Sequence, residues 1–199
     1  MTAVRFEYDE ATAIVVPGDG GEDAAQWPRA AVERFVAHHD LDPRRRAALE
    51  RVLHRAQRGA ASDPATNILL HDPGTDAWAP LRLTLLEGGL PPAQQQEYLA
   101  PAGVLRPQLR GHVAPGLGVG YSATVLTDAS TADIRWLYLP GGQAFFAVLR
   151  AVPLPAVMGL AVAVENILES VRLDGLAPGT AEAFALDGLV PPADTGWRS

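Results

Sequence analysis

The chain of 199 residues contains neither cysteine nor lysine, so all 16 of its basic residues are arginine. Without thiols it cannot form disulfides, iron–sulfur clusters or cysteine-ligated zinc sites. Without a lysine amine it can form no Schiff base and has no P-loop lysine to contact a phosphate. Several enzyme classes are therefore excluded, and only His, Asp and Glu side chains remain as metal ligands.

The sequence also lacks a long uninterrupted apolar segment. The longest apolar run, 151–164, contains two prolines and is shorter than the roughly 20 residues of a membrane-spanning helix. The first ten residues carry three acids and no apolar stretch of the kind found in a signal peptide. We therefore expect a cytoplasmic protein without a membrane span.

The charge balance is acidic, with a formal net charge of −7. This excess is expected to repel nucleic acid, although a local arginine patch would still attract an acidic group. Hydrophobic residues make up 48% and charged residues 20% of the chain, which is typical of an ordinary globular protein. We predict one domain over residues 1–173, followed by a loosely packed Gly-, Pro- and Ala-rich tail over 174–199.

Apolar residues at helical spacing predict two early helices. The first begins at Pro28 and ends near His38. The second begins at Asp42-Pro43, where Asp42 is a suitable N-cap, and ends near Gly59. Together they predict an N-terminal helical hairpin, and a short third helix is expected at 91–98.

Alternating or β-rich runs predict the strands 4–8, 13–16, 66–71, 79–87, 104–111, 120–127, 134–139 and 144–150. We expect hairpins between the first two, between 66–71 and 79–87, and around the turn Pro140-Gly141-Gly142. A long amphipathic helix follows and is expected to end in the segment Ile167–Leu173. The predicted fold class is α+β, an α/β/α sandwich with a mainly antiparallel sheet.

The order strand, turn, strand, helix over residues 134–173, closing in Ile-Leu-Glu-Ser-Val-Arg-Leu, resembles the C-terminal half of the Mog1/PsbP-like family. The resemblance implies an α/β/α sandwich with an antiparallel sheet. It also implies an accessory or assembly role rather than catalysis, because most members of that family act in this way.

Two glycine-containing segments partly resemble catalytic or phosphate-binding motifs. The segment Gly120–Thr124 resembles the start of a nucleophile elbow around Ser122, but a β-rich run follows where the elbow needs a helix. The segment Gly116–Gly120 likewise lacks the following helix that a dinucleotide-binding loop requires. We interpret Ser122 as a strand residue and the glycines as a bulge or wide turn.

Histidines and acids provide the remaining candidates for chemistry. His38 and His39 are adjacent on a predicted helix and point about 100° apart, so they cannot easily share one metal ion. We predict no metal site, no cofactor and no catalytic residue. The alternative hypothesis is an enzyme or small-ligand-binding protein whose pocket is assembled by the fold from His71, Asp72, His112 and Tyr121.

The second predicted helix carries an arginine face. Four residues on it are the candidate partner-binding residues: Arg44, Arg51, Arg55 and Arg58. Arginine forks bind carboxylates and phosphates in a bidentate manner, so an acidic protein partner fits this face, although a solvated helix surface gives the same pattern. The leading hypothesis is a non-enzymatic accessory or adaptor protein that binds another protein, as part of an assembly or secretion system.

Overall fold

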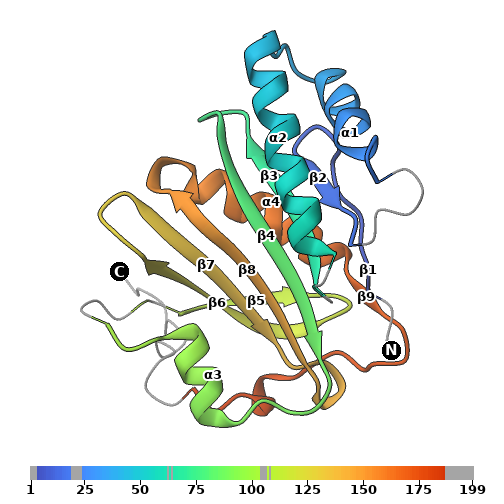
Figure 1. Ribbon diagram of the computed structural model, residues 1–199. Helices are drawn as coiled ribbons and strands as arrows, with labels where there is room; N and C mark the ends of the chain where they lie inside the picture. The colour runs from blue at the N-terminus through green and yellow to red at the C-terminus, as the bar shows by residue number, and fades with distance from the viewer. Residues whose placement is uncertain are drawn as a thin grey trace, which may run out of the picture.

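The computed structural model describes residues 4–18, 24–61, 63, 65–103, 107 and 109–186 (Figure 1). The helices are α1 (Trp27–Val36), α2 (Pro43–Ala60), α3 (Pro92–Leu99) and α4 (Val157–Ser170), with short 3₁₀ turns η1 (Pro140–Gly142), η2 (Leu154–Ala156) and η3 (Ala181–Ala183). The strands are β1 (Val4–Arg5), β2 (Ala13–Val16), β3 (Thr66–Asp72), β4 (Ala77–Leu86), β5 (Leu109–Ala114), β6 (Gly118–Leu126), β7 (Thr131–Tyr138), β8 (Ala144–Pro153) and β9 (Arg172–Leu173).

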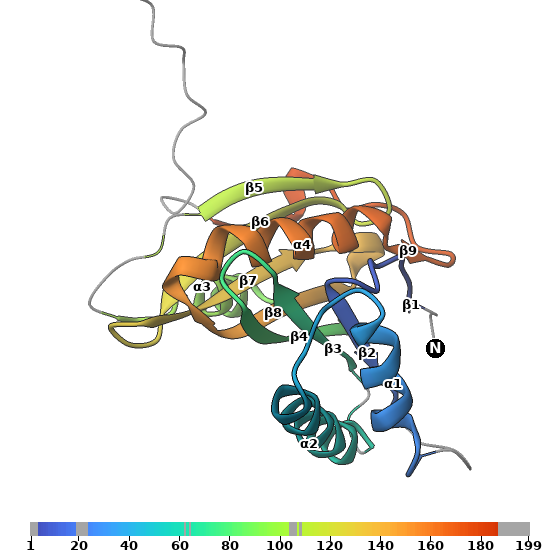
Figure 2. The ribbon, with the colours of Figure 1, turned by 90° about the horizontal axis from the view of Figure 1, so that it is seen from above.

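Seven strands form one antiparallel sheet in the order β2-β3-β4-β8-β7-β6-β5, and β1 pairs with β9 in a separate two-stranded sheet. The large sheet curls around α4, while α1 and α2 lie on its opposite face (Figure 2). Helix α3 packs beside β6 and β7 on the same side as α1 and α2. The α/β/α sandwich with a helical pair and a late long helix is thus confirmed.

Alternation along the central strands separates the two faces of the sheet. In β8, Phe145, Ala147 and Leu149 are fully buried in the core beneath α4, whereas Phe146 points to the α3 side. Helix α4 contributes fully buried Leu160 to the same core, with the other buried α4 residues at helical spacing. Burying each leucine or phenylalanine side chain here stabilises the fold by about 1.5–3 kcal/mol. This layer holds the largest of the apolar clusters among the described residues.

Helices α1 and α2 pack on the other face over a second, smaller core. Phe35 of α1 and Leu53 of α2 contact Leu69 of β3 in this cluster. Asp42 caps α2 as expected, because its Oδ1 accepts a hydrogen bond of 2.9 Å from the backbone N–H of Arg45. The pair of helices is therefore held to the sheet by its own apolar contacts.

The predicted hairpin between 4–8 and 13–16 is wrong. Only Val4 and Arg5 are extended in a ladder, and they pair with β9, while β2 pairs with β3. A turn around Asp9, whose side chain accepts from the backbone N–H of Ala11, separates the two runs. The backbone hydrogen-bonding groups of each strand are instead paired with a strand distant in sequence. Local alternation of apolar residues does not reveal such a pairing.

The end of α4 also differs from expectation. The helix stops at Ser170, whose hydroxyl bonds to the carbonyl of Ile167 and accepts from the backbone N–H of Glu7. Val171 then adopts an extended backbone (φ −57°, ψ 134°), and Arg172 begins strand β9. The segment 167–173 is therefore part helix and part strand.

The other predicted elements are present with shifted ends. The strand expected at 104–111 begins at Leu109 and continues to Ala114, and residues 104–106 and 108 lie outside the described residues. The segment 174–186, predicted to pack loosely, lies against the sheet: Gly179 bridges to Gly118, and Leu186 is buried. Residues 187–199 lie outside the described part. None of the described helices has both the length and the apolar content that a bilayer crossing requires.

Candidate functional site

The four candidate arginines lie in one row along the exposed side of α2. At 100° per residue, Arg44, Arg51, Arg55 and Arg58 fall within an arc of about 60°. All four are exposed, and none forms an ion pair with a residue that the structure describes. We call these four residues the arginine row. Helix geometry therefore places on one face the four arginines that the sequence indicates as partner-binding residues.

The neighbouring arginines have internal partners. Arg45 lies 3.1 Å from the carboxylate of Asp76 and 3.7 Å from that of Asp42. Arg46 donates from Nε to the carbonyl oxygen of Leu41 at 2.7 Å. These two side chains fasten α2 to adjacent segments, which leaves the arginine row as the cationic surface of the helix.

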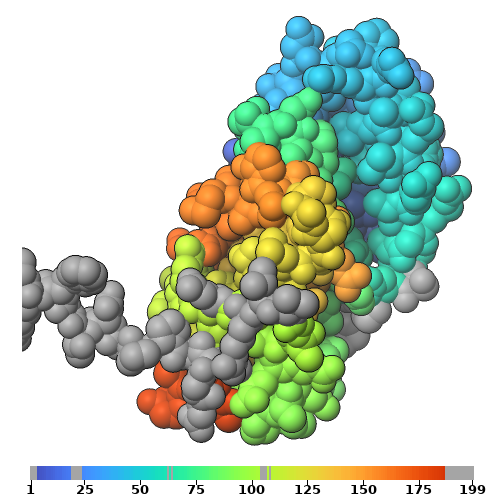
Figure 3. Space-filling view, turned by 90° about the vertical axis from the view of Figure 1, so that its left-hand side faces the viewer, coloured from blue at the N-terminus to red at the C-terminus, as the bar shows by residue number. Residues whose placement is uncertain are grey.

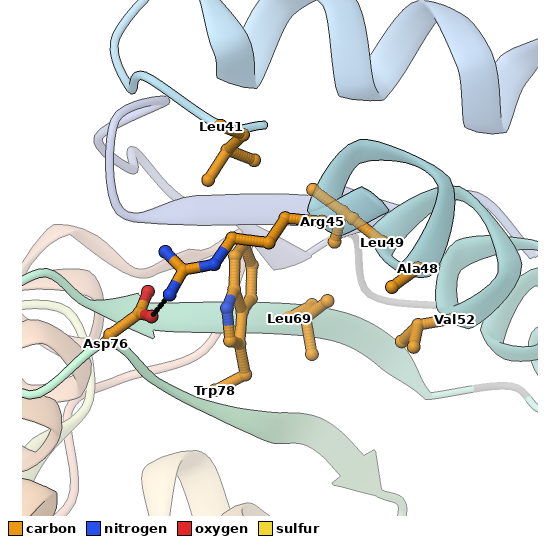
Figure 4. Close-up of a pocket in the computed structure, with 8 residues that line it drawn as sticks. All are labelled: Leu41, Arg45, Ala48, Leu49, Val52, Leu69, Asp76 and Trp78. Atoms are coloured by element: carbon orange, nitrogen blue, oxygen red, sulfur yellow. Dashed lines mark ion pairs between the residues drawn. The ribbon is translucent and has the colours of Figure 1, made fainter. Parts of the chain in front are cut away.

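A groove of 280 Å³ separates α2 from strands β3 and β4. Its lining residues are Leu41, Arg45, Ala48, Leu49, Val52, Leu69, Asp76 and Trp78 (Figure 4). Figure 3 shows the hollow between α2 and the strands on this side of the molecule. Ala48 and Val52 form the α2 wall, and Trp78 and Leu69 form the sheet wall. The groove is mostly apolar and adjoins the arginine row.

At one end of the groove, Asp76 contacts both Arg45 and His71, and we call these three residues the Asp76 relay. The carboxylate of Asp76 contacts Arg45 through Oδ2 at 3.1 Å and His71 Nε2 through Oδ1 at 3.3 Å. Asp76 has a φ of +54°, in the left-handed region that Asp tolerates better than most residues. The tight turn between β3 and β4 thus places one carboxylate between an exposed cation and a buried imidazole.

His71 lies inside an aromatic cluster behind this end of the groove. Its side chain is 5% exposed, and its ring centroid lies 4.5 Å from that of Trp78 and 5.4 Å from that of Phe35. His39, which stacks on Phe35, lies 5.1 Å away. Burial lowers the pKa of His71, and the hydrogen bond to Asp76 opposes this effect only in part.

The ring nitrogens of this pair differ in their partners. His71 Nδ1 is buried without a hydrogen-bond partner among the described residues, whereas His39 Nε2 bonds to the carbonyl oxygen of Ala11 at 2.5 Å. The sequence predicts His71 at the end of the strand 66–71 and His39 next to the end of the first helix. One feature of the sequence could have placed His71 in this cluster. His71 and Leu69 are two residues apart on β3, so both lie on the face that α1 and α2 cover.

The four residues of the alternative pocket are not brought together. His71 faces α1, while Tyr121 packs on Phe184 beside α3, four strands away on the same face. Asp72 and His112 face α4, from β3 and from the opposite edge strand β5. The hairpin predicted between 66–71 and 79–87 is present, and in its turn Asp72 accepts from the Gly74 backbone and from the Thr75 hydroxyl.

His112 belongs to a separate contact beneath α4. Its Nδ1 lies 2.5 Å from the hydroxyl of fully buried Tyr138, and its Nε2 lies 3.8 Å from Glu169. Burial raises the pKa of Tyr138, which keeps the phenol protonated. Because the phenol is inaccessible, we interpret this chain of contacts as a fastening between β5, β7 and α4.

The remaining motifs have structural roles. Ser122 is a buried residue of β6, and the strand continues to Leu126, so the helix required by a nucleophile elbow is absent there. Gly116 lies in the turn between β5 and β6, whereas Gly118 and Gly120 belong to β6 itself. In the part of the chain that the structure describes, no group of three or more His, Cys, Asp or Glu side chains is arranged to hold a metal ion.

Comparisons with protein-family models, with curated proteins and with solved structures gave no match for this chain. The Mog1/PsbP-like resemblance of residues 134–173 therefore stays a prediction. The arginine row and the groove beside it are the features of this chain that bear on its function.

Proposed function

We propose that this protein is a non-enzymatic, cytoplasmic adaptor that binds an acidic segment of another protein through α2. The observation that carries the proposal is the arginine row: four exposed guanidinium groups on one helix face, unpaired within the described residues, in a chain with a net charge of −7. A local cationic surface on an acidic protein steers an acidic partner to one place and disfavours nucleic acid elsewhere on the surface.

The chemistry of arginine supports a protein partner with carboxylates. Each guanidinium presents a planar fork that matches a carboxylate in bidentate geometry. The exposed row leaves these forks available, because the acids nearest α2 are engaged elsewhere: Asp42 caps the helix, Asp76 pairs with Arg45, and Glu50 lies 3.9 Å from His54. Binding through such exposed charges is expected to weaken strongly as salt increases.

The geometry favours this proposal over the enzyme hypothesis, because His71, Asp72, His112 and Tyr121 lie on two faces of the sheet. The α/β/α sandwich is also the architecture implied by the Mog1/PsbP-like resemblance of residues 134–173, for which an accessory role is the usual one.

The test is affinity purification of the tagged protein from its host at about 0.1 M and about 0.5 M salt, with mass spectrometry of bound proteins. We expect an acidic partner that is lost at the higher salt and lost at both salts from the double variant Arg51→Glu, Arg55→Glu. The matched control Arg29→Glu, Arg34→Glu makes the same charge change on exposed positions of α1 and should retain the partner. A partner that survives the α2 reversal, or no partner at either salt, would refute the proposal.

A further inference from the structure

We infer that the groove between α2 and strands β3–β4 receives an apolar anchor side chain from an amphipathic helix of the partner, whose acidic residues bind the arginine row. This inference rests on the proposed function and names the chemistry of the partner segment. The apolar groove would then contact the same partner that the arginine row binds through charge.

The size of the groove favours side chains over a whole small molecule. Its volume of 280 Å³ lies just below the range of about 300–1,000 Å³ that is typical of small-ligand sites. Six of its eight lining residues are apolar or aromatic, and the two charged ones, Arg45 and Asp76, neutralise each other at one end. A leucine or phenylalanine side chain fits such a space without leaving a buried charge unpaired.

The walls of the groove expose apolar surface that the fold itself does not cover. Val52 is 47% exposed although it lies one turn from buried Leu49, and Trp78 is only partly buried. A partly exposed indole beside a hollow is the kind of residue that anchors protein interfaces, because it combines a large contact area with few rotatable bonds. The wall is therefore suited to contact with a second protein.

Charge complementarity indicates an amphipathic partner. On the α2 surface Arg55 and Arg44 lie within about 40° of Ala48, directly beside the groove. A helix lying in the groove with apolar residues at i and i+4 toward Val52 would present the flanking positions i+3 and i+7 to the arginines. Acids at those positions would be bound, whereas an acid at the Asp76 end would meet only the internally paired Arg45 and Asp76. The site is thus expected to fix the direction of the bound helix.

The test uses two synthetic peptides of about 16 residues, long enough to form helix. The first has a leucine and a phenylalanine at positions i and i+4 among glutamates, and the second has alanine at both anchor positions. Binding of fluorescent versions is measured by anisotropy at low and high salt. We expect the protein to bind the anchored peptide at least tenfold more tightly than the alanine peptide.

Four variants separate the groove from the arginine row. Ala48→Trp fills the groove and should abolish the preference for the anchored peptide, whereas Ala47→Trp, at an exposed position about 100° around α2, should preserve it. Val52→Asp should also remove the preference, without added bulk. The double variant Arg51→Glu, Arg55→Glu should weaken the binding of both peptides.

Equal binding of the two peptides to the unaltered protein, or a preference that survives both Ala48→Trp and Val52→Asp, would overturn the anchor inference and leave the arginine-row proposal standing. Failure of both peptides to bind at low salt would contradict both proposals. Circular dichroism of each variant confirms that a loss of binding does not reflect unfolding.

Discussion

His71 is buried among aromatic rings, and its protonation state is coupled to the stability of the fold. Burial holds its pKa below the ordinary value of 6.5, so below that pH the unfolded chain binds more protons than the folded protein. The contribution of His71 to the free energy of unfolding is therefore fully present above pH 6.5 and is lost as the pH falls toward the lowered pKa. Urea denaturation between about pH 7.5 and 5.5 should show this decrease.

The variant His71→Gln removes the titrating group and should flatten the pH dependence in this window. The charged or titratable groups around His71 are Asp76 in the β3–β4 turn, Asp72 at the end of β3, His39 after α1, and Arg45 on α2 through Asp76. The unaltered protein, measured in parallel, is the reference for this slope. An unchanged slope in His71→Gln would show that another group is responsible.

Gly120 is fixed by the approach of Tyr138 from the neighbouring strand. A Cβ at this position would lie 2.3 Å from the Tyr138 ring and 2.7 Å from the carbonyl oxygen of Leu137. We expect Gly120→Ala to destabilise the protein by about 1–3 kcal/mol in urea denaturation, because the buried ring must move. Gly111→Ala on the paired strand β5 meets no atom within 4 Å and should change stability by less than about 0.5 kcal/mol; equal losses would contradict the packing argument.

At the scale of elements, α2 depends on its N-cap. Asp42→Ala removes the hydrogen bond to the Arg45 backbone and should lower the free energy of unfolding by about 1 kcal/mol. The first turn of α2 carries Arg44 and Arg45, so fraying there should also weaken acidic-peptide binding. Asp40→Ala, just outside the helix at an exposed position, is the control. A cap variant as stable as the control would show that the rest of the helix makes the cap dispensable.

Elements with a regular local pattern could be predicted from the sequence. The 3.6-residue spacing of Leu49 and Leu53 gave α2, and the Pro140-Gly141-Gly142 turn gave the β7–β8 pairing. Pairings between distant segments could not be predicted, because the extended run at Val4 has equivalent hydrogen-bonding groups for any neighbour. Only the folded chain shows that β9 is that neighbour.

The candidate site was predictable to the same extent. The arginine row is a property of one helix, so its spacing in the sequence places it on one face. The groove is lined by α2, by strands β3 and β4 and by the segment preceding α2, and its shape depends on how far α2 stands from the sheet. The Asp76 relay was missed for the same reason, since it joins a turn, a strand and a helix.

At the scale of the whole molecule, the apolar core beneath α4 and the one beneath α1 and α2 lie on opposite faces of one sheet. The core beneath α4 includes Leu160, whereas the smaller core beneath α1 and α2 includes Leu53. We expect Leu53→Ala and Leu160→Ala each to cost about 2–5 kcal/mol but to act on different regions. Leu53→Ala should speed hydrogen exchange mainly in α1, α2 and β2, while Leu160→Ala should speed it throughout the central strands.

Hydrogen exchange followed by mass spectrometry on both variants checks this expectation. The unaltered protein provides the reference, in which β8 and its neighbours β4 and β7 should be the most protected strands. Uniform acceleration in the Leu53 variant would show that the helical pair and the sheet unfold as one unit, so that docking at the α2 groove would be coupled to the stability of the entire fold.

The late position of α4 in the chain has a consequence during synthesis on the ribosome. Every strand of the seven-stranded sheet is translated before α4, yet this helix covers the buried face of the sheet. At about 5–20 residues per second, the nascent sheet spends seconds with that face uncovered. The β1–β9 pair, which joins Val4 to Leu173, can close only when this interval ends. This interval is therefore when the nascent chain is most exposed to aggregation and most in need of chaperones.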